Sequence, residues 1–162
     1  MCPKLRNMTS VFFIREDGLL CLYRIGSRVA NGKYVGAAGG HFEKEELSSP
    51  EACALREVKE ELELDPKDVE DLKLRYVTLR YYQEEIRQNY YFFARLNTDR
   101  ELSSNEGNLR WVTWEELRTL EMPLSARHMM DHYLAVGRYD NALYAGATEP
   151  GGSRFVKMES FD

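Results

Sequence analysis

The feature that most restricts how this chain can fold is one helix signal placed between two strand-rich regions. Ser49 and Pro50 form a helix start, with serine at the N-cap and proline at the first helical position. Asp65-Pro66 then breaks the helix, so the predicted helix covers residues 50–62. Because strands and helices do not alternate, a parallel sheet of βαβ units is not expected. The predicted fold class is mixed α/β, of the α+β type, with a largely antiparallel or mixed sheet.

Strand signals lie on both sides of this helix. The expected strands are rich in β-branched and aromatic residues, and they cover residues 8–14, 19–25, 74–82, 86–96 and 109–113. Residues 34–38 form a short stretch rich in small residues. The segments between them that are expected to form loops or turns cover residues 16–18, 26–33, 43–48, 66–72 and 97–108. Two further helices are expected at residues 114–120 and from Ser125, as N-cap, to about Gly137. Residues 139–152 are expected to be irregular, and residues 154–161 to form a terminal strand.

Charge, cysteine content and hydropathy argue against several classes of protein. The net charge of −5 argues against a surface that coats a nucleic acid polymer. The three cysteines are odd in number and lack C-x-x-C spacing, which argues against a disulfide framework or a zinc site and suits a cytoplasmic location. The sequence shows no secretory signal and no apolar run of about 18 residues, so no membrane partner is expected. A length of 162 residues fits a single domain.

Three glutamates share one face of the predicted helix, away from its main apolar stripe. Glu57, Glu60 and Glu61 have i, i+3 and i+4 spacing, and like charges at this spacing repel by a few tenths of a kcal/mol. A hard cation such as Mg²⁺ would relieve the repulsion, because it prefers carboxylate and water oxygens as ligands. An isolated acidic run is more often a solvated face. The preceding Gly39-Gly40 and the neighbouring Arg56 favour a metal site instead.

The stretch from Gly39 to Leu64 resembles the Nudix box, G-x5-E-x7-R-E-U-x-E-E-x-G-U, in which U is apolar. The matching residues are Gly40, Glu46, Arg56, Glu57, Val58, Glu60, Glu61 and Leu64. The flanking strand order extends the resemblance over about residues 6–135, and it implies that family's α-β-α sandwich with a mixed central sheet. Residues 139–162 then form a C-terminal extension. Its larger apolar side chains could pack on the domain or on a second subunit of a homodimer, and they are Tyr144, Phe155, Val156 and Phe161.

Two positions depart from the box. Nine residues rather than seven follow Glu46 before the arginine, so Glu46 is the weakest match and Glu43 or Glu45 could take its place. Glu63 stands where the box has glycine. This substitution predicts a different helix exit, one that uses Asp65-Pro66 instead of a glycine C-cap.

The resemblance implies metal-dependent hydrolysis of a nucleoside diphosphate linked to another group, which makes a small-molecule nucleotide the substrate. The implied ligands of Mg²⁺ or Mn²⁺ are the carbonyl of Gly39 and the carboxylates of Glu57, Glu60 and Glu61. Arg56 would orient the carboxylates through charge-assisted hydrogen bonds. Gly40 and Glu46 would belong to the loop of the motif that approaches the phosphates.

The identity of the catalytic base stays open at this point, because its location varies within the family. Glu57 or Glu60 on the helix could serve. Glu106, in the loop before the strand at residues 109–113, is the best-placed distant alternative.

The substrate is suggested by the stretch before the box. Residues 32–43 are similar to the G-K-W-x-G-x-G-G-K-x-E run of the oxidised-purine nucleoside triphosphatases, with Tyr34 at the tryptophan position. Arg24 and the polar loop after it also fit that subgroup. This similarity implies hydrolysis of a nucleoside triphosphate, 8-oxo-dGTP being one candidate, to monophosphate and pyrophosphate. The alternatives are a dinucleotide polyphosphate, a nucleotide sugar, or a non-catalytic nucleotide-binding module, and the complete set of box carboxylates argues against the last.

Overall fold

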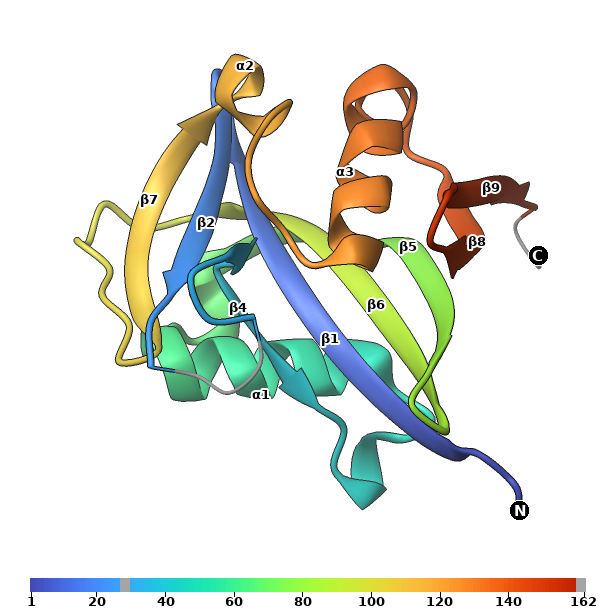
Figure 1. Ribbon diagram of the computed structural model, residues 1–162. Helices are drawn as coiled ribbons and strands as arrows, with labels where there is room; N and C mark the ends of the chain where they lie inside the picture. The colour runs from blue at the N-terminus through green and yellow to red at the C-terminus, as the bar shows by residue number, and fades with distance from the viewer. Residues whose placement is uncertain (27–29, 160–162) are drawn as a thin grey trace.

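The structure, a computed structural model, describes residues 1–26 and 30–159 (Figure 1). Its elements in chain order are β1 (Lys4–Arg15), β2 (Gly18–Arg24), β3 (Tyr34–Gly36), β4 (Ala38–His41), the 3₁₀ turn η1 (Lys44–Glu46), α1 (Pro50–Leu62), η2 (Pro66–Asp68), β5 (Val69–Tyr82), β6 (Glu85–Leu96), β7 (Gly107–Thr113), α2 (Trp114–Leu117), α3 (Leu124–Ala135), η3 (Gly137–Tyr139), β8 (Leu143–Glu149) and β9 (Gly152–Met158).

One mixed sheet holds all the strands of the described residues. The main strand order is β3-β2-β1-β6-β5-β8-β9, with β4 also paired to β1 and β7 to β2. The pairs β1–β6 and β5–β8 are parallel, and the other pairs are antiparallel. The prediction of a mixed α+β fold without βαβ alternation is therefore confirmed.

Helices cover both faces of the sheet, as Figure 1 shows for α1 and α3 on opposite sides of β1. Side chains alternate along β1, because successive residues of a strand point to opposite faces. Val11 and Phe13 pack in the cluster that contains Ala54, Val58 and Leu62 of α1. Phe12 packs in the cluster that contains Met129, Met130 and Tyr133 of α3. The two clusters form the two cores of the expected α-β-α sandwich.

Helix α1 begins where the sequence predicts but ends differently. The Ser49 hydroxyl accepts a hydrogen bond from the backbone N–H of Ala52 at 3.3 Å, and Pro50 is the first helical residue. Glu63 itself forms the C-cap in the left-handed conformation, with φ 57° and ψ 30°. The prediction of an exit without this cap is therefore wrong. Arg100 donates to the carbonyl of Glu63 at 2.8 Å, so the glutamate keeps the cap that a glycine would form more easily.

Glu63→Gly is expected to raise the free energy of unfolding by up to about 1 kcal/mol. An L-residue in the left-handed region pays roughly 1–2 kcal/mol, of which the greater entropy of unfolded glycine cancels a part. Glu51→Gly, inside the same helix, is the matched control and should lower stability by roughly 0.5–1 kcal/mol. Urea unfolding at unchanged slope measures both. A lower midpoint for Glu63→Gly would contradict the strain argument.

Two element boundaries differ from the sequence predictions because tertiary contacts decide them. In residues 66–72 only Pro66–Asp68 is helical, and β5 begins at Val69, which pairs with Leu96 of β6. Ser125 is not an N-cap. It lies buried inside α3, which starts at Leu124 after Pro123.

The extension contains more strand than predicted. Residues 143–149, expected to be irregular, form β8 parallel to β5, and β9 ends at Met158. Parallel pairing with a strand 68 residues earlier leaves no local signal, so the prediction was wrong there. Glu159 follows the strand without belonging to it, and residues 160–161 of the expected strand lie outside the described residues.

Buried aromatic and polar contacts attach the extension to the sheet. Tyr76 of β5 stacks on Tyr144 of β8 with 5.5 Å between ring centroids, and its hydroxyl lies 2.7 Å from His132 Nδ1. The buried Arg75 donates to the carbonyl of Gly137 at 2.6 Å and to Asp140 Oδ1 at 3.1 Å. Each buried polar group here needs its hydrogen-bond partner, because an unpaired polar group is costly in the protein interior. These contacts therefore hold residues 137–144 against the sheet of the core.

Two further observations bear on the class of protein. All three cysteines carry free thiols. Among the helices of the described residues, none combines the length and apolar character that crossing a membrane requires.

Candidate active site

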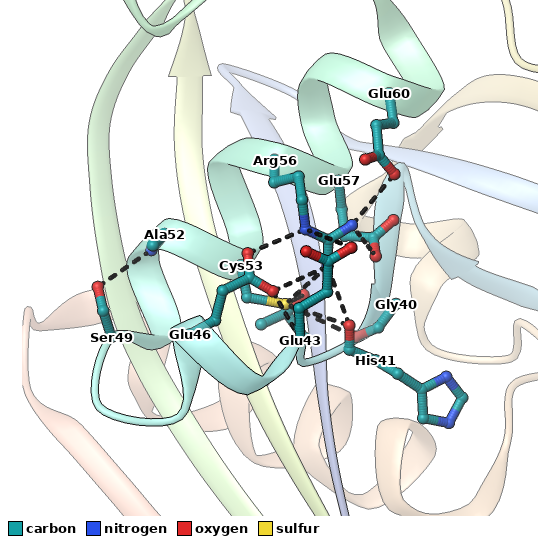
Figure 2. Close-up of polar contacts among 11 residues, drawn as sticks. Gly40, His41, Glu43, Glu46, Ser49, Ala52, Cys53, Arg56, Glu57 and Glu60 are labelled. Carbon is teal, nitrogen blue, oxygen red and sulfur yellow. Dashed lines mark hydrogen bonds and ion pairs between the residues drawn. The ribbon is translucent and has the colours of Figure 1, made fainter.

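Arg56 on α1 is the centre of a hydrogen-bonded cluster between this helix, β4 and η1 (Figure 2). Its Nε and Nη2 donate to the two carboxylate oxygens of Glu46 at 2.9 and 3.0 Å. Nη2 also donates to the carbonyl of His41 at 3.0 Å. The hydrogen bond from Arg56 holds the pKa of Glu46 below its usual range, and the same bond raises the pKa of Arg56. The pair is therefore fully charged, with bidentate geometry.

This arrangement resolves which glutamate accompanies the arginine. Glu46 is buried against Arg56, whereas Glu45 is exposed and Glu43 Oε1 lies 3.8 Å from Arg56 Nε. Residues 47–49 connect η1 to α1, and Glu46 contacts Arg56 although two extra residues separate them in the sequence.

Arg56 also contacts two of the three helix glutamates. Its Nη1 donates to Glu57 Oε1 at 2.9 Å and to Glu60 Oε2 at 3.1 Å. Glu57 is buried beside β4, where a Cβ on Gly40 would lie 2.3 Å from Glu57 Oε1. Glycine at position 40 thus makes room for a carboxylate next to the strand.

The third helix glutamate, Glu61, lies in an acidic environment. Burial first, and then the negative charges of Glu57 and Glu106, raise the pKa of Glu61 to about 8, while a hydrogen bond from the Gly39 backbone acts in the opposite direction. Three carboxylates from α1 and from the loop before β7 therefore approach one another. Arg56 pairs with Glu57 and Arg24 with Glu106, so two guanidinium groups face three carboxylates, and a divalent cation would add further positive charge.

The donor set can be tested against the metal that the motif implies. Among residues 1–26 and 30–159, no three His, Cys, Asp or Glu side chains already converge as ligands. The reason is visible in Figure 2: Glu57 and Glu60 both turn toward Arg56. The oxygens are nevertheless of the hard type that Mg²⁺ and Mn²⁺ prefer. Glu61 lies close enough to Glu57 for the Glu57 charge to raise the pKa of Glu61. The residues therefore fit the ion, and Glu60 would join after turning its side chain.

Strand pairing brings the two distant candidates, Arg24 and Glu106, together. Arg24 of β2 pairs with Gly107 of β7, so the loop acid comes beside the arginine. Arg24 Nη2 lies 3.6 Å from Glu106 Oε2, and the Ile25 N–H donates to the Glu106 carbonyl at 3.2 Å.

A cleft of about 280 Å³ opens next to these acids. One wall contains Gly39, Gly40 and Glu61. The other surfaces that line it are apolar or polar residues from the sheet and from the start of α3, among them Leu22, Val35, Asn89, Tyr91, Ser125 and Ala126. The volume suits a small molecule rather than a polymer.

Tyr34 does not reach this cleft. It packs against Tyr23 at 5.0 Å between ring centroids and beneath Arg110 at 5.4 Å, while its neighbours Val35 and Gly36 line the cavity.

The sequence matches the family model of the NUDIX domain over residues 4–133. The chain belongs to the Nudix family. The match covers most of the chain and includes every residue of the site described above.

Solved structures similar to this Nudix chain include the MutT protein from Bacillus halodurans, with a TM-score of 0.68 and 23% identity over 93% of this chain and 97% of that one. The MutT protein from Methanosarcina mazei Go1 gives a TM-score of 0.66 at 20% identity, over 82% and 95% of the two chains. An Ap4A hydrolase from C. elegans gives 0.64 at 14% identity, over 80% and 96%. No curated protein sequence matches the chain significantly. At these identities the similarity establishes the fold.

Family membership confirms the prediction of a Nudix pyrophosphohydrolase acting on small nucleotide substrates, an enzyme class that generally uses divalent metal ions. Among the predicted site residues of this Nudix enzyme, Arg24, Gly39, Gly40 and Glu61 line the cleft. Glu46, Arg56, Glu57 and Glu60 form the hydrogen-bonded cluster described above. The sequence reasoning missed the polar residues of the cleft floor, such as Asn89, and a group of arginines at its end. The two-residue alternation in the strands at 74–82 and 86–96 was the available signal, but it could not be used without the pairing register.

Proposed function

We propose that this Nudix hydrolase converts a nucleoside triphosphate to the monophosphate and pyrophosphate, with Mg²⁺ or Mn²⁺ bound by Glu57, Glu60 and Glu61 and by the Gly39 carbonyl. The observation that carries the proposal is the position of Glu61 and Gly39 in the wall of the cleft, with Glu57 directly behind Gly40. Carboxylates on one wall would hold the ion where the phosphates of a bound nucleotide lie.

In this mechanism the bound cation would neutralise the phosphates and activate a water molecule. Arg56 positions the carboxylates: its five donors connect Glu46, Glu57 and Glu60 and the His41 carbonyl. The apolar part of the cleft, lined by Leu22 and Ala126, would exclude bulk water from the nucleobase of the substrate.

Three carboxylates remain candidates to accept the proton of the attacking water. Glu57 is buried and bonded to Arg56, and Glu60 is the more exposed of the helix pair. Glu106, held near Arg24 on a different loop, can approach a substrate without leaving an intrahelical contact.

The choice of substrate rests on similarity and on the cleft. The likeness of residues 32–43 to the oxidised-purine triphosphatases supports a purine nucleoside triphosphate, with 8-oxo-dGTP as a candidate. The fold shared with MutT proteins is consistent with this choice. The position of Val35 in the cleft lining, with Tyr34 outside it, supports contact between the nucleobase and Val35 rather than Tyr34. A dinucleotide polyphosphate is the second candidate, consistent with the fold shared with the C. elegans Ap4A hydrolase.

Turnover should depend on an added divalent ion. We expect Mg²⁺ or Mn²⁺ to support release of pyrophosphate from at least one nucleoside triphosphate, and EDTA to abolish it, because the developing charge on the phosphates would lose its counter-ion. A panel of triphosphates, dinucleotide polyphosphates and nucleotide sugars, assayed with each metal and with EDTA, measures this. Absence of turnover across the whole panel would overturn the proposed function.

We further propose that the chain acts as a single domain in the cytoplasm on small molecules, without a nucleic acid polymer or a membrane as partner. The free cysteines and the net charge of −5 support this setting. β8 and β9 continue the sheet of the core, which supports residues 139–162 as an extension of the same domain. A homodimer formed through the extension is compatible with its exposed Val156.

A further inference from the structure

Three arginines form a row across the middle of the sheet. In the strand register, Arg6 of β1 lies opposite Arg87 of β6, and Arg87 lies opposite Arg80 of β5. All three side chains line the same cleft. Like charges directly opposite each other on neighbouring strands destabilise a sheet, so this row has an energetic cost that the fold alone does not explain.

The charge of the row is only partly compensated. Glu85 accepts from Arg6 Nη1 at 3.2 Å and from Arg87 Nε at 3.3 Å. In the part of the chain that the structure describes, Arg80 forms no ion pair. Its guanidinium lies 4.6 Å from the centre of the Tyr82 ring, which Arg87 also approaches, at 5.0 Å. Three guanidiniums and one carboxylate leave two positive charges in a chain of net charge −5. Such a local excess attracts anions.

The row lies at one end of the cleft, beyond the glycines of the metal-binding wall. Ser10 pairs with Gly39, and Arg6 precedes Ser10 by four residues, which corresponds to about 13 Å along the strand. The apolar end, with Tyr91 and Ala126, lies at the level of Ser10 or beyond it. A nucleotide with its base in the apolar end and its first phosphates beside Gly39 would therefore direct a longer phosphate chain toward the arginines.

We propose that Arg6, Arg87 and Arg80 form a phosphate subsite, which binds the end of a polyphosphate chain farthest from the nucleoside and selects substrates with three or more phosphates over nucleotide sugars, which have two. The planar guanidinium donates paired hydrogen bonds that match phosphate oxygens. A sugar in the same place would leave the positive charges uncompensated. The inference rests on the proposed function for its location in the reaction, and it adds the residues that choose among its candidate substrates.

Arg80→Gln is the sharpest variant, because the change removes a like charge and no ion pair. Arg95→Gln is the matched control: Arg95 lies eight residues after Arg87 on β6, about 26 Å away, and does not line the cleft. Calorimetric titration with inorganic tripolyphosphate in metal-free buffer should show about tenfold weaker binding for Arg80→Gln and unchanged binding for Arg95→Gln. Equal affinity in all three proteins, or no binding by the unmodified chain, would overturn the subsite. Urea unfolding verifies that both variants fold.

Steady-state hydrolysis rates then test whether the arginine row selects among substrates by the length of their phosphate chain. For Arg80→Gln, kcat/KM should fall about tenfold for a nucleoside triphosphate and a dinucleoside tetraphosphate, mainly through KM, and less than about threefold for a nucleotide sugar. An equal fall for all three substrates, or a preference of the unmodified enzyme for the nucleotide sugar, would overturn the inference. The proposed function fails in a different way, through absence of any turnover, and the tripolyphosphate titration still reports on the arginine row in that case.

Discussion

Replacing Glu60 by glutamine is expected to lower kcat by at least about 10²-fold while the fold stays intact. Glutamine keeps the shape of the side chain but removes the charge that a metal ligand or proton acceptor needs, and losses of this size follow removal of such a group. The structural cost is small, because the Glu60 side chain is 57% exposed and its ion pair with Arg56 is an i,i+4 surface contact worth at most about 0.5 kcal/mol.

Glu51→Gln is the matched control for this variant. Glu51 is an exposed acid in the first turn of the same helix and occupies a variable position of the motif. The Glu51→Gln substitution removes one negative charge from α1 at a position that does not line the cleft, so kcat should change less than about twofold. Steady-state kinetics at saturating metal and substrate compare the two, and urea unfolding verifies the fold. Near-normal kcat in Glu60→Gln would remove Glu60 from the site.

The second large effect concerns stability. Asp140→Ala is expected to lower the free energy of unfolding by about 3 kcal/mol, because it leaves the Arg75 guanidinium buried without its carboxylate. The Arg75 side chain is 5% exposed, and Asp140 also accepts from the Tyr144 hydroxyl at 2.5 Å and from the Ala142 N–H at 2.9 Å. The contact with Arg75 connects β5 to the segment that leads into β8, and the other two contacts hold Asp140 in place within that segment and β8.

Asp131→Ala provides the comparison. Asp131 pairs with Arg127 at 2.7 Å on the exposed surface of α3, where loss of an ion pair costs at most about 1 kcal/mol. Urea unfolding followed by tyrosine and tryptophan fluorescence measures both variants. Equally small losses would mean that residues 137–144 are not held by this network. A separate early transition in the unmodified chain would contradict the proposal of a single domain.

Local spacing made the candidate site predictable. The i, i+3 and i+4 positions of Glu57, Glu60 and Glu61 place them on one helix face whatever surrounds the helix. Ser49 and Pro50 start the helix through contacts within one turn, and the structure has both as expected. These features depend on neighbours in the chain, so the sequence carries them directly.

Features that depend on pairing between distant segments could not be predicted in the same way. β8 pairs with β5 across 68 residues, and nothing in the sequence of residues 139–152 indicates that partner. Glu63 departs from the glycine that usually ends this helix, yet tertiary contacts, including one from Arg100, accompany the left-handed cap.

The acidic helix, its N-cap and the family's motif were determined by the sequence alone, because helix geometry repeats within a few residues. The tertiary structure decided the surroundings of that helix. It selected Glu46 as the partner of Arg56, turned Tyr34 away from the cleft, brought Arg24 to Glu106, and aligned the arginine row on three strands. The physical reason is register: a shift of one residue in a strand turns every side chain to the other face, and only packing of the complete sheet chooses between the two.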